Sequence, residues 1–413
     1  SAPLAPPGPP PRRPPRSRKM SRAADAKALA AQVEESLKSA AQGQAAAAVK
    51  RALFGKLAAQ WNDAEAAGDK EALEALQALR PQLKVLPAKQ PLASKLLMYV
   101  RMVLAIVVAG WGSMCVLALA PLRLTHPLLR ALGVPNGLLP TDLVGTLWGR
   151  AVLAAAGVRV TLEGKGPSEQ WGAGGCGVVV YNHASNLDPF IVSQICRSLA
   201  PKYLGKKMLF KFPFFGWMSL ALGMVPINRG DREKAVKTMN ETVGSIMRRW
   251  GRSVAVSPEG TRTTDGHLIL PFKKGPFHLQ EQTSAPLLPV VIHGAYELWP
   301  PRQLFTATGE VTVTVLPVQA VDRSENAREA SRLALQRSLA QAKAARPELG
   351  ARPLSAFGAL ECLAVLLCSG GVFWLFWRLY AALISALGLG VTGVIGLFSA
   401  ITVVVAVFVD QFL

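Results

Sequence analysis

A histidine and an aspartate five positions apart are the residues of this sequence best suited to catalysis. His183 and Asp188 follow the apolar, β-branched run 178–181, which has the composition of a strand buried on both faces. Asp188 precedes Pro189, a pair typical of a helix start with the carboxylate at the N-cap and the ring at the first helical position. In the loop between strand and helix, the carboxylate can bond one ring nitrogen of His183 and leave the other to accept a proton.

This pair is a catalytic triad without its nucleophile. Ser185 is too close in sequence to stand across the imidazole, and no Gly-x-Ser-x-Gly motif occurs in the chain. A substrate hydroxyl can take the place of the serine if His183 removes its proton and it attacks an activated acyl group. The alternative is structural: His183 ends a strand and Asp188 caps a helix. The spacing alone does not decide between these interpretations.

A second stretch of the same design favours catalysis. The apolar run 254–256 ends in Ser-Pro-Glu-Gly-Thr-Arg at 257–262. Two further blocks are Gly-Met-Val-Pro-Ile-Asn-Arg at 223–229 and Leu-Pro-Val-Val-Ile at 288–292. Together with His-Ala-Ser-Asn-Leu-Asp at 183–188, they resemble the glycerolipid acyltransferases, in particular the 1-acylglycerol-3-phosphate acyltransferases, in order and spacing. The resemblance covers about residues 150 to 320.

The resemblance implies a role for each block. It makes His183 the general base and Asp188 the residue that orients it. It places around the acceptor phosphate Glu259, Gly260, Thr261, Arg262 and Arg229. The two arginines each follow an apolar, strand-like run, and a guanidinium can bind a phosphate through two hydrogen bonds. Lys206 lies in a segment that in the family usually has Glu at the position of Met208, and its alternative role is at a membrane surface. No metal or other cofactor is implied.

The activity implied is transfer of a fatty acyl chain from acyl-CoA, or from acyl carrier protein, to the sn-2 hydroxyl of 1-acylglycerol 3-phosphate, giving phosphatidic acid. One alternative is an acyltransferase for another lysophospholipid or for glycerol 3-phosphate. The other is a catalytically silent membrane scaffold of the same fold. The intact set of His183, Asp188, Glu259 and Arg262 argues against the scaffold, because polar groups beside buried strands are costly without a purpose.

Alternating strand and helix patterns predict the elements that position these side chains. Apolar strands are predicted at 158–161, 177–181, 253–256, 287–292 and 311–316, and helices near 189–198 and 232–250. The pattern is typical of an α/β fold with a largely parallel central sheet flanked by helices. Sites in such sheets lie at the strand ends, which is where the loops of His183 and Glu259 emerge.

The composition indicates a membrane protein with a basic surface. The chain has 413 residues, 50% of them hydrophobic, and a net charge of +20. The charge suits anionic membranes or phosphate-bearing substrates, and because no zinc-finger or RNP-like pattern accompanies it we expect no nucleic-acid partner. The five cysteines show no CxxC spacing, so we expect reduced thiols.

Two apolar regions predict membrane helices. Residues 102–122 are uncharged and long enough to cross a bilayer, and residues 357–409 suggest two more helices, broken at 388–390. The positive charges that flank 102–122 weakly favour a cytosolic position for the residues before it. If 102–122 crossed the membrane once, the catalytic domain would then lie on the side away from cytosolic acyl-CoA. A re-entrant helix paired with an apolar helix near 141–158 removes that conflict. A lumenal or organelle topology is the alternative.

Five regions are predicted along the chain. They are a disordered Pro/Arg-rich leader (1–20), a helical N-terminal region (21–92), membrane-associated helices (93–156), the acyltransferase domain (157–347) and C-terminal membrane helices (354–413). The N-terminal region is interpreted as one or two helices forming a surface hairpin. The expected location is integral to the endoplasmic reticulum or a plastid membrane, with membrane lipids, an acyl donor and a lysophospholipid as partners.

Overall fold

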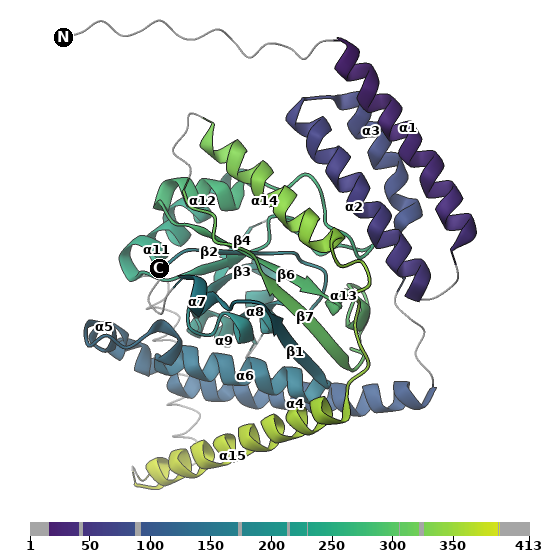
Figure 1. Ribbon diagram of the computed structural model, residues 1–413. Helices are drawn as coiled ribbons and strands as arrows, with labels where there is room; N and C mark the ends of the chain where they lie inside the picture. The colour runs from purple at the N-terminus through teal and green to yellow at the C-terminus, as the bar shows by residue number, and fades with distance from the viewer. Residues whose placement is uncertain are drawn as a thin grey trace, which may run out of the picture.

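A seven-stranded sheet with helices on both faces lies at the centre of the computed structural model (Figure 1). The structure describes residues 16–40, 44–86, 92–171, 176–212, 215–228, 230–304, 306–321, 326–386 and 388. The strands are β1 (Val158–Glu163), β2 (Val178–Tyr181), β3 (Lys202–Lys206), β4 (Val225–Ile227), β5 (Val254–Val256), β6 (Leu287–His293) and β7 (Gly309–Val315). Their spatial order is β1-β7-β6-β2-β5-β3-β4.

The sheet is mostly parallel, as predicted. Strands β6, β2, β5, β3 and β4 run in one direction, and β1 and β7 pair with each other in the opposite direction because β7 is antiparallel to β6. The α/β fold class is therefore confirmed. The parallel strands bring their carboxyl ends to one edge, where the loops that follow β2, β5, β3 and β4 meet.

Helices cover both faces because the strands are apolar on both sides. Val178 and Val180 belong to one buried cluster, and Val179 and Tyr181 to another, as the alternation of a strand requires. The first cluster packs beneath α11 (Gly244–Trp250), α12 (Gly275–Thr283) and α14 (Ala327–Ala344). The second packs against α6 (Pro140–Ala156) and α8 (Asp188–Ile195).

Shorter elements complete the described chain. The α-helices are α5 (His126–Ala131), α7 (Pro167–Trp171), α9 (Phe215–Ala221), α10 (Arg232–Thr238) and α13 (Ala295–Leu298). The 3₁₀ turns are η1 (Arg80–Leu83), η2 (Ala120–Thr125), η3 (Asn136–Leu138) and η4 (Lys207–Lys211), and a π-helical turn, η5 (Met239–Val243), joins α10 to α11. The predicted helix over 232–250 is thus present, with a π turn at its centre.

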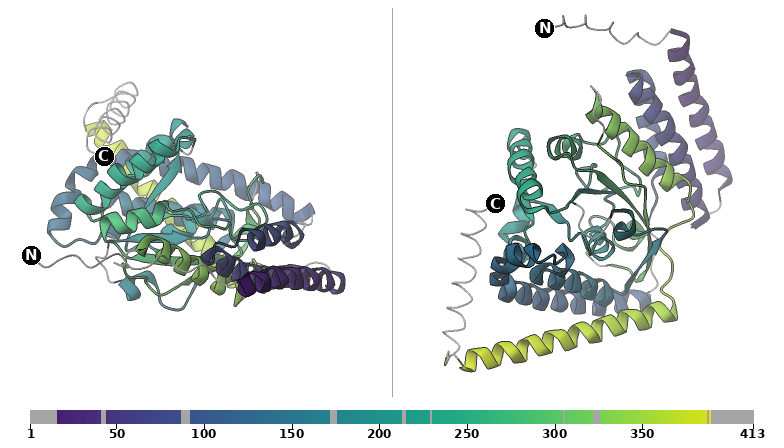
Figure 2. Two further views of the ribbon diagram at one scale, coloured as in Figure 1. Left: turned by 90° about the horizontal axis from the view of Figure 1, so that it is seen from above. Right: turned by 60° about the vertical axis from the view of Figure 1, so that its left-hand side comes forward.

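The N-terminal region differs from the surface hairpin expected of it. It forms three helices, α1 (Arg16–Ser39), α2 (Gln44–Ala66) and α3 (Lys70–Leu79). Figures 1 and 2 show them beside α14, over one face of the sheet. Phe54, Leu57 and Leu76 are buried in the same cluster as sheet residues such as Val178. The hairpin interpretation was wrong because the apolar side chains of these helices complete the core on one face of the sheet.

Three long helices lie together along the opposite side of the molecule, at the bottom of Figure 1: α4 (Leu92–Leu119), α6 and α15 (Ala356–Ala386). The predicted pairing of the first apolar helix with α6 is confirmed: Trp148 Nε1 donates to the carbonyl of Ala109 at 3.2 Å. A Cβ on Gly112 would meet the Trp148 ring at 1.7 Å, so only glycine permits this approach.

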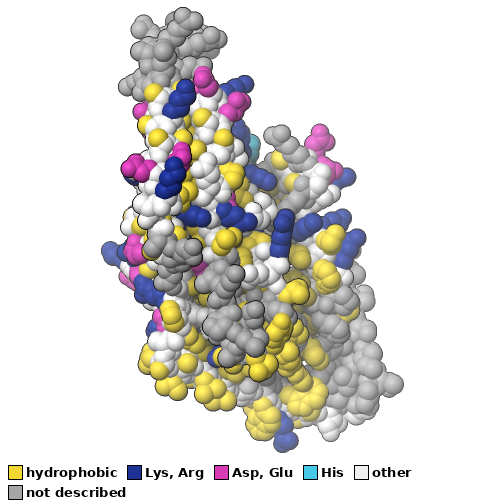
Figure 3. Space-filling view, turned by 90° about the vertical axis from the view of Figure 1, so that its right-hand side faces the viewer, with side chains coloured by type: hydrophobic (Ala, Val, Ile, Leu, Met, Phe, Trp, Pro, Cys, Tyr) yellow, Lys and Arg dark blue, Asp and Glu magenta, His cyan; other side chains and the backbone are white. Residues whose placement is uncertain are grey.

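Two of these helices are long and apolar enough to cross a membrane, over Leu96–Leu117 and Ala356–Leu379. Hydrophobic side chains gather at the bottom of Figure 3, over the side where α4 and α15 lie, and charged side chains gather above them. Exposed Met208, Phe212 and Trp217 add to the apolar surface. The second C-terminal helix predicted beyond the break at 388–390 lies outside the described residues.

A buried ionic cluster fixes α6 to the sheet at the edge away from the strand ends described above. The Asp142 carboxylate on α6 accepts hydrogen bonds from Lys202, the first residue of β3, and from Arg252, just before β5. Burial alone would raise the pKa of Asp142, but the two cations outweigh it and hold that pKa below its usual range. Asp142 is the shared anion, so its removal would leave two buried cations without their carboxylate.

Candidate active site

The predicted dyad is formed where β2 ends. His183 Nδ1 lies 2.8 Å from Asp188 Oδ2, and since an ionised carboxylate can only accept, Nδ1 carries the proton and donates it. Asp188 is fully buried, whereas the His183 side chain is 17% exposed. In the neutral imidazole this tautomer leaves Nε2 as the acceptor nitrogen, as a general base requires.

The N-cap role predicted for Asp188 is wrong. Helix α8 begins at Asp188 itself, and the N-cap position is Leu187. The Asp188 carboxylate turns back toward the preceding loop, where Oδ2 also accepts from the backbone amides of Ala184 and Ser185 at 2.7 and 2.8 Å. Three donors therefore converge on one oxygen, which fixes both the loop and the imidazole. This geometry favours the catalytic interpretation of His183 and Asp188 over the structural one.

Glu259 joins the two motif loops. Its Oε1 accepts from the backbone amide of His183 at 2.7 Å, and its Oε2 accepts from the backbone amide of Ile269 at 2.8 Å. The side chain is buried. Burial raises the pKa of Glu259 to about 8, against the opposing effect of the two amides, which favour the anion. With both oxygens engaged by the backbone, Glu259 acts on the site by fixing the positions of His183 and the loop after β5.

Arg262 lies on the open side of the same loop. Its side chain is exposed and donates to Asn186 Oδ1, within the His183–Asp188 loop. Thr261 is exposed beside it. Gly260 has φ +71°, and a Cβ there would meet the Lys273 side chain at 2.7 Å, so a larger residue would be both strained and obstructed. The loop therefore presents the cations of Arg262 and Lys273 next to a glycine backbone.

Lys206 reaches the same edge from β3. It is the last residue of that strand, is exposed, and pairs in register with Ile227 of β4. Arg229 follows two positions after Ile227 but lies outside the described residues. The sheet thus brings Lys206 and Ile227 together, next to β5 and the loop that follows it.

Two residues that the predicted site omitted hold the dyad loop. Asn182 accepts from the Ile292 amide at 2.7 Å and donates to the Ile292 carbonyl at 3.1 Å. These two bonds attach the residue before His183 to the neighbouring strand β6. Ser185 Oγ is buried and donates to the carbonyl of Trp299 at 2.8 Å. Ser185 is therefore a structural residue and not a nucleophile. The Asn-His pair at the end of a buried strand was the sequence signal for Asn182.

This arrangement can deprotonate a hydroxyl next to an anion-binding surface. The base is held by a buried carboxylate, and the adjoining loops carry Arg262 and Lys273. A substrate that carries both a hydroxyl and a phosphate would find the two complementary groups side by side.

Comparison with known proteins agrees with this chemistry. Residues 159–293 match the family model described as Acyltransferase. A 1-acyl-sn-glycerol-3-phosphate acyltransferase from Saccharomyces cerevisiae is 34% identical over 144 residues, which are 34% of this chain and 46% of the yeast protein. The beta form of the same enzyme from Homo sapiens is 34% identical over 139 residues, 34% of this chain and 49% of the human protein.

A solved structure is also similar. It is the 1-acyl-sn-glycerophosphate (LPA) acyltransferase from Thermotoga maritima, with 23% identity, a TM-score of 0.47, and coverage of 61% of this chain and 98% of that one. The chain spans about half the length of the curated relatives it matches. Residues 159–293, which contain the His183–Asp188 dyad, are thus an acyltransferase-family segment of this chain, and 1-acyl-sn-glycerol-3-phosphate acyltransferases are among its distant relatives.

Proposed function

We propose that this acyltransferase moves a fatty acyl chain from acyl-CoA to the sn-2 hydroxyl of 1-acylglycerol 3-phosphate. The observation that carries the proposal is that Glu259 bonds directly to the backbone of His183, so the base and the cationic loop after β5 form one unit. The curated relatives with the same printed activity support it.

In this reaction His183 Nε2 takes the proton of the acceptor hydroxyl as its oxygen attacks the thioester carbonyl. The carbon–sulfur bond then breaks, and the proton passes from the imidazolium to the leaving thiolate, giving CoA and the new ester. Asp188 keeps Nδ1 protonated and stabilises the imidazolium while it exists. Arg262, together with Gly260, Thr261, Arg229 and Lys206, binds the acceptor phosphate.

An acceptor panel tests the proposal. Purified protein is given oleoyl-CoA with 1-acylglycerol 3-phosphate, glycerol 3-phosphate, lysophosphatidylcholine or lysophosphatidylethanolamine, and CoA release is measured. We expect turnover chiefly with 1-acylglycerol 3-phosphate, because a terminal phosphate suits an exposed arginine better than a zwitterionic headgroup. A preference for another acceptor would assign the enzyme to that substrate, and no turnover with any of them would favour a silent scaffold.

Replacing Arg262 by lysine should weaken use of the acceptor more than of the acyl donor. Lysine keeps the charge but loses the planar fork, so kcat/KM for the acceptor should fall. The loss of transition-state stabilisation should be about 1–3 kcal/mol, the range of charge-assisted hydrogen bonds. The measurement is steady-state kinetics with each substrate varied in turn. Arg249→Lys is the matched control, since Arg249 lies on α11, which leads to the opposite end of β5. Equal acceptor kinetics in wild type and Arg262→Lys would remove Arg262 from the site.

The membrane setting is part of the proposal. The two long apolar helices support a membrane-bound enzyme that meets its lipid acceptor at the bilayer. The endoplasmic reticulum or a plastid membrane is the proposed location, and relatives described as chloroplastic come from Brassica napus and Arabidopsis thaliana.

A further inference from the structure

The loop after β5 is held to the dyad along its inner side. We name residues 257–274 the acceptor loop. Within it the amide of Thr263 donates to the carbonyl of His183 at 2.9 Å, and the amide of Lys273 donates to the carbonyl of Pro258 at 2.7 Å. Together with the bond from Ile269 to Glu259, these contacts couple the path of the loop to His183 and to the position of Arg262.

The outer side of the same loop is held by the N-terminal helices. Arg80, at the end of α3, binds Asp265 through two hydrogen bonds, Nε to Oδ2 at 2.6 Å and Nη2 to Oδ1 at 3.1 Å. Both side chains are largely buried, at 16% and 15% exposure, so this pair is shielded more than a surface salt bridge. The amide of Val85 also donates to the carbonyl of Asp265 at 3.0 Å.

The charge on Asp265 is maintained by these contacts. Burial alone would raise the pKa of Asp265, but hydrogen bonds from Arg80 and from the Thr263 hydroxyl outweigh it and hold that pKa below its usual range. Asp265 Oδ1 also accepts from the amide of His267 at 3.0 Å. The carboxylate thus organises a turn of the acceptor loop around the N-terminal arginine.

His267 adds a second fixed point. Its ring stacks on Phe54 of α2, with centroids 4.2 Å apart and planes 7° from parallel. Burial lowers the pKa of His267 to about 4, so the ring is neutral near pH 7. Nε2 lies 2.7 Å from the carbonyl of Leu83, and the neutral ring donates its proton there. The guanidinium carbon of Arg80 also lies over the Phe54 ring, 5.6 Å from its centre.

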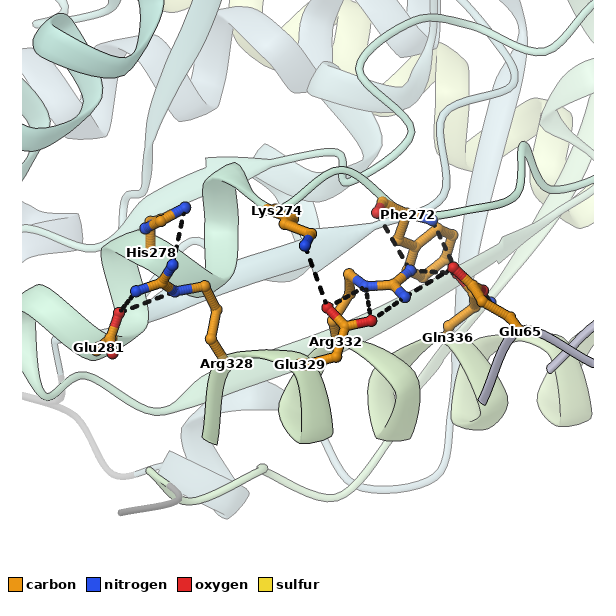
Figure 4. A network of polar contacts seen from close by, with 9 residues as sticks. All are labelled: Glu65, Phe272, Lys274, His278, Glu281, Arg328, Glu329, Arg332 and Gln336. Carbon is orange, nitrogen blue, oxygen red and sulfur yellow. Dashed lines mark hydrogen bonds and ion pairs between the residues drawn. The ribbon is translucent and has the colours of Figure 1, made fainter. Parts of the chain in front are cut away.

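A third fixed point lies near the end of the loop, at Phe272. Side chains of α14 connect it to α2 (Figure 4). The amide of Phe272 donates to Gln336 Oε1 at 2.8 Å, and Gln336 Nε2 donates to Asn62 and Glu65 of α2 at 2.6 and 2.8 Å. Arg332 also bonds Glu65, at 2.7 Å. The acceptor loop is therefore tied to the N-terminal helices at Asp265, His267 and Phe272.

We propose that the N-terminal helices form the outer wall of the acceptor site, with Arg80 and His267 as positioning residues that hold the acceptor loop in the conformation that binds the headgroup. The proposal rests on the proposed function, in which this loop binds the acceptor phosphate. Arg80, Phe54 and Leu83 all precede residues 159–293, which match the family model, so this wall lies outside the segment that the model describes. Neither Arg80 nor His267 needs to touch the substrate, because each acts through the loop backbone.

The test compares Arg80→Ala with Arg337→Ala in the full chain. Arg337 also links α14 to α2, through an exposed pair with Asp63 at 3.8 Å, but the described contacts of that pair do not include the acceptor loop. Loss of a shielded, bidentate ion pair should raise the acceptor KM of Arg80→Ala by about 10-fold, with the acyl-CoA KM within about twofold of wild type. Arg337→Ala should match wild type in both. Arg80→Lys, which keeps the charge and one hydrogen bond, should lie between and serves if the alanine variant does not fold.

Amide hydrogen exchange supplies a readout that does not depend on the acceptor. Residues 263–272 should exchange faster in Arg80→Ala than in wild type or Arg337→Ala, because their outer contacts are weakened. A lower melting temperature with an unchanged acceptor KM and unchanged exchange in this loop would overturn the proposal and leave Arg80 a general stabiliser. If wild-type protein acylates no acceptor, the proposed function fails, and the exchange experiment still decides whether Arg80 holds the loop.

Discussion

Replacing His183 by alanine is expected to lower the rate of acyl transfer by about 10² to 10⁴, the usual contribution of a general base. The reason is geometric as well as chemical. His183 is the group that Asp188, Glu259 and the loop backbone jointly orient, through its Nδ1, its amide and its carbonyl. The measurement is CoA release with 1-acylglycerol 3-phosphate at matched protein concentration, with thermal unfolding recorded in parallel.

His278→Ala is the matched control for this variant. His278 is a partly exposed residue of α12 whose Nε2 lies 3.3 Å from Arg328 Nη1, in the network of Figure 4. Its loss should leave the rate within about twofold of wild type, as expected of a surface position with no bond to the site. Wild-type turnover by His183→Ala would refute the base mechanism, whereas equal losses in both variants would point to a general effect of histidine removal on folding.

The strand ends that carry the site could be predicted because apolar residues change abruptly to polar ones there. Val178 to Val180 and Val254 to Val256 are short apolar runs that stop at polar residues, and parallel pairing then brings the loops that follow them together. The register Val180 to Val256 and the bond from His183 to Glu259 confirm that expectation.

Strand β3 was missed because its residues do not resemble a strand, and β4 was noted only as a strand-like run before Arg229. Strand β3 begins and ends with lysine and contains Gly205, and β4 has three residues with Pro226 at its centre. Lys202 is tolerated in the interior because its ammonium group donates hydrogen bonds to Asp142 and to the carbonyl of Leu222. Asp142 lies 60 positions earlier in the chain, a separation that no local pattern detects.

The contribution of the N-terminal helices was hidden for the same reason. Arg80 and Asp265 are 185 positions apart, and nothing in their local sequence links them. The partners of His267 are likewise distant in sequence: the aromatic ring of Phe54 and the backbone carbonyl of Leu83. The local sequence pattern predicts which residues can be catalytic, whereas the contacts that position them come from residues distant in sequence.

Asp188→Asn is expected to lose nearly as much activity as His183→Ala while keeping most of the fold. Asparagine can place its Oδ1 where Asp188 Oδ2 accepts from Ala184 and Ser185, so the loop bonds can persist. What it cannot supply is the negative charge beside Nδ1 when His183 becomes an imidazolium. In this buried setting that charge is worth far more than in water, and a loss of about 10² to 10⁴ in kcat is expected.

Asp69→Asn separates this electrostatic role from capping and burial. Asp69 is also buried, is the N-cap of α3, accepts from the amide of Ala72 at 3.4 Å, and has one oxygen with no described partner, as Asp188 does. Asparagine caps helices about as well as aspartate, so Asp69→Asn should change both rate and melting temperature little. If Asp188→Asn behaved like Asp69→Asn, the carboxylate would have no electrostatic role in the reaction. A large fall in kcat for Asp188→Asn, at a melting temperature close to that of Asp69→Asn, would instead show that the charge on Asp188 is what the imidazolium requires.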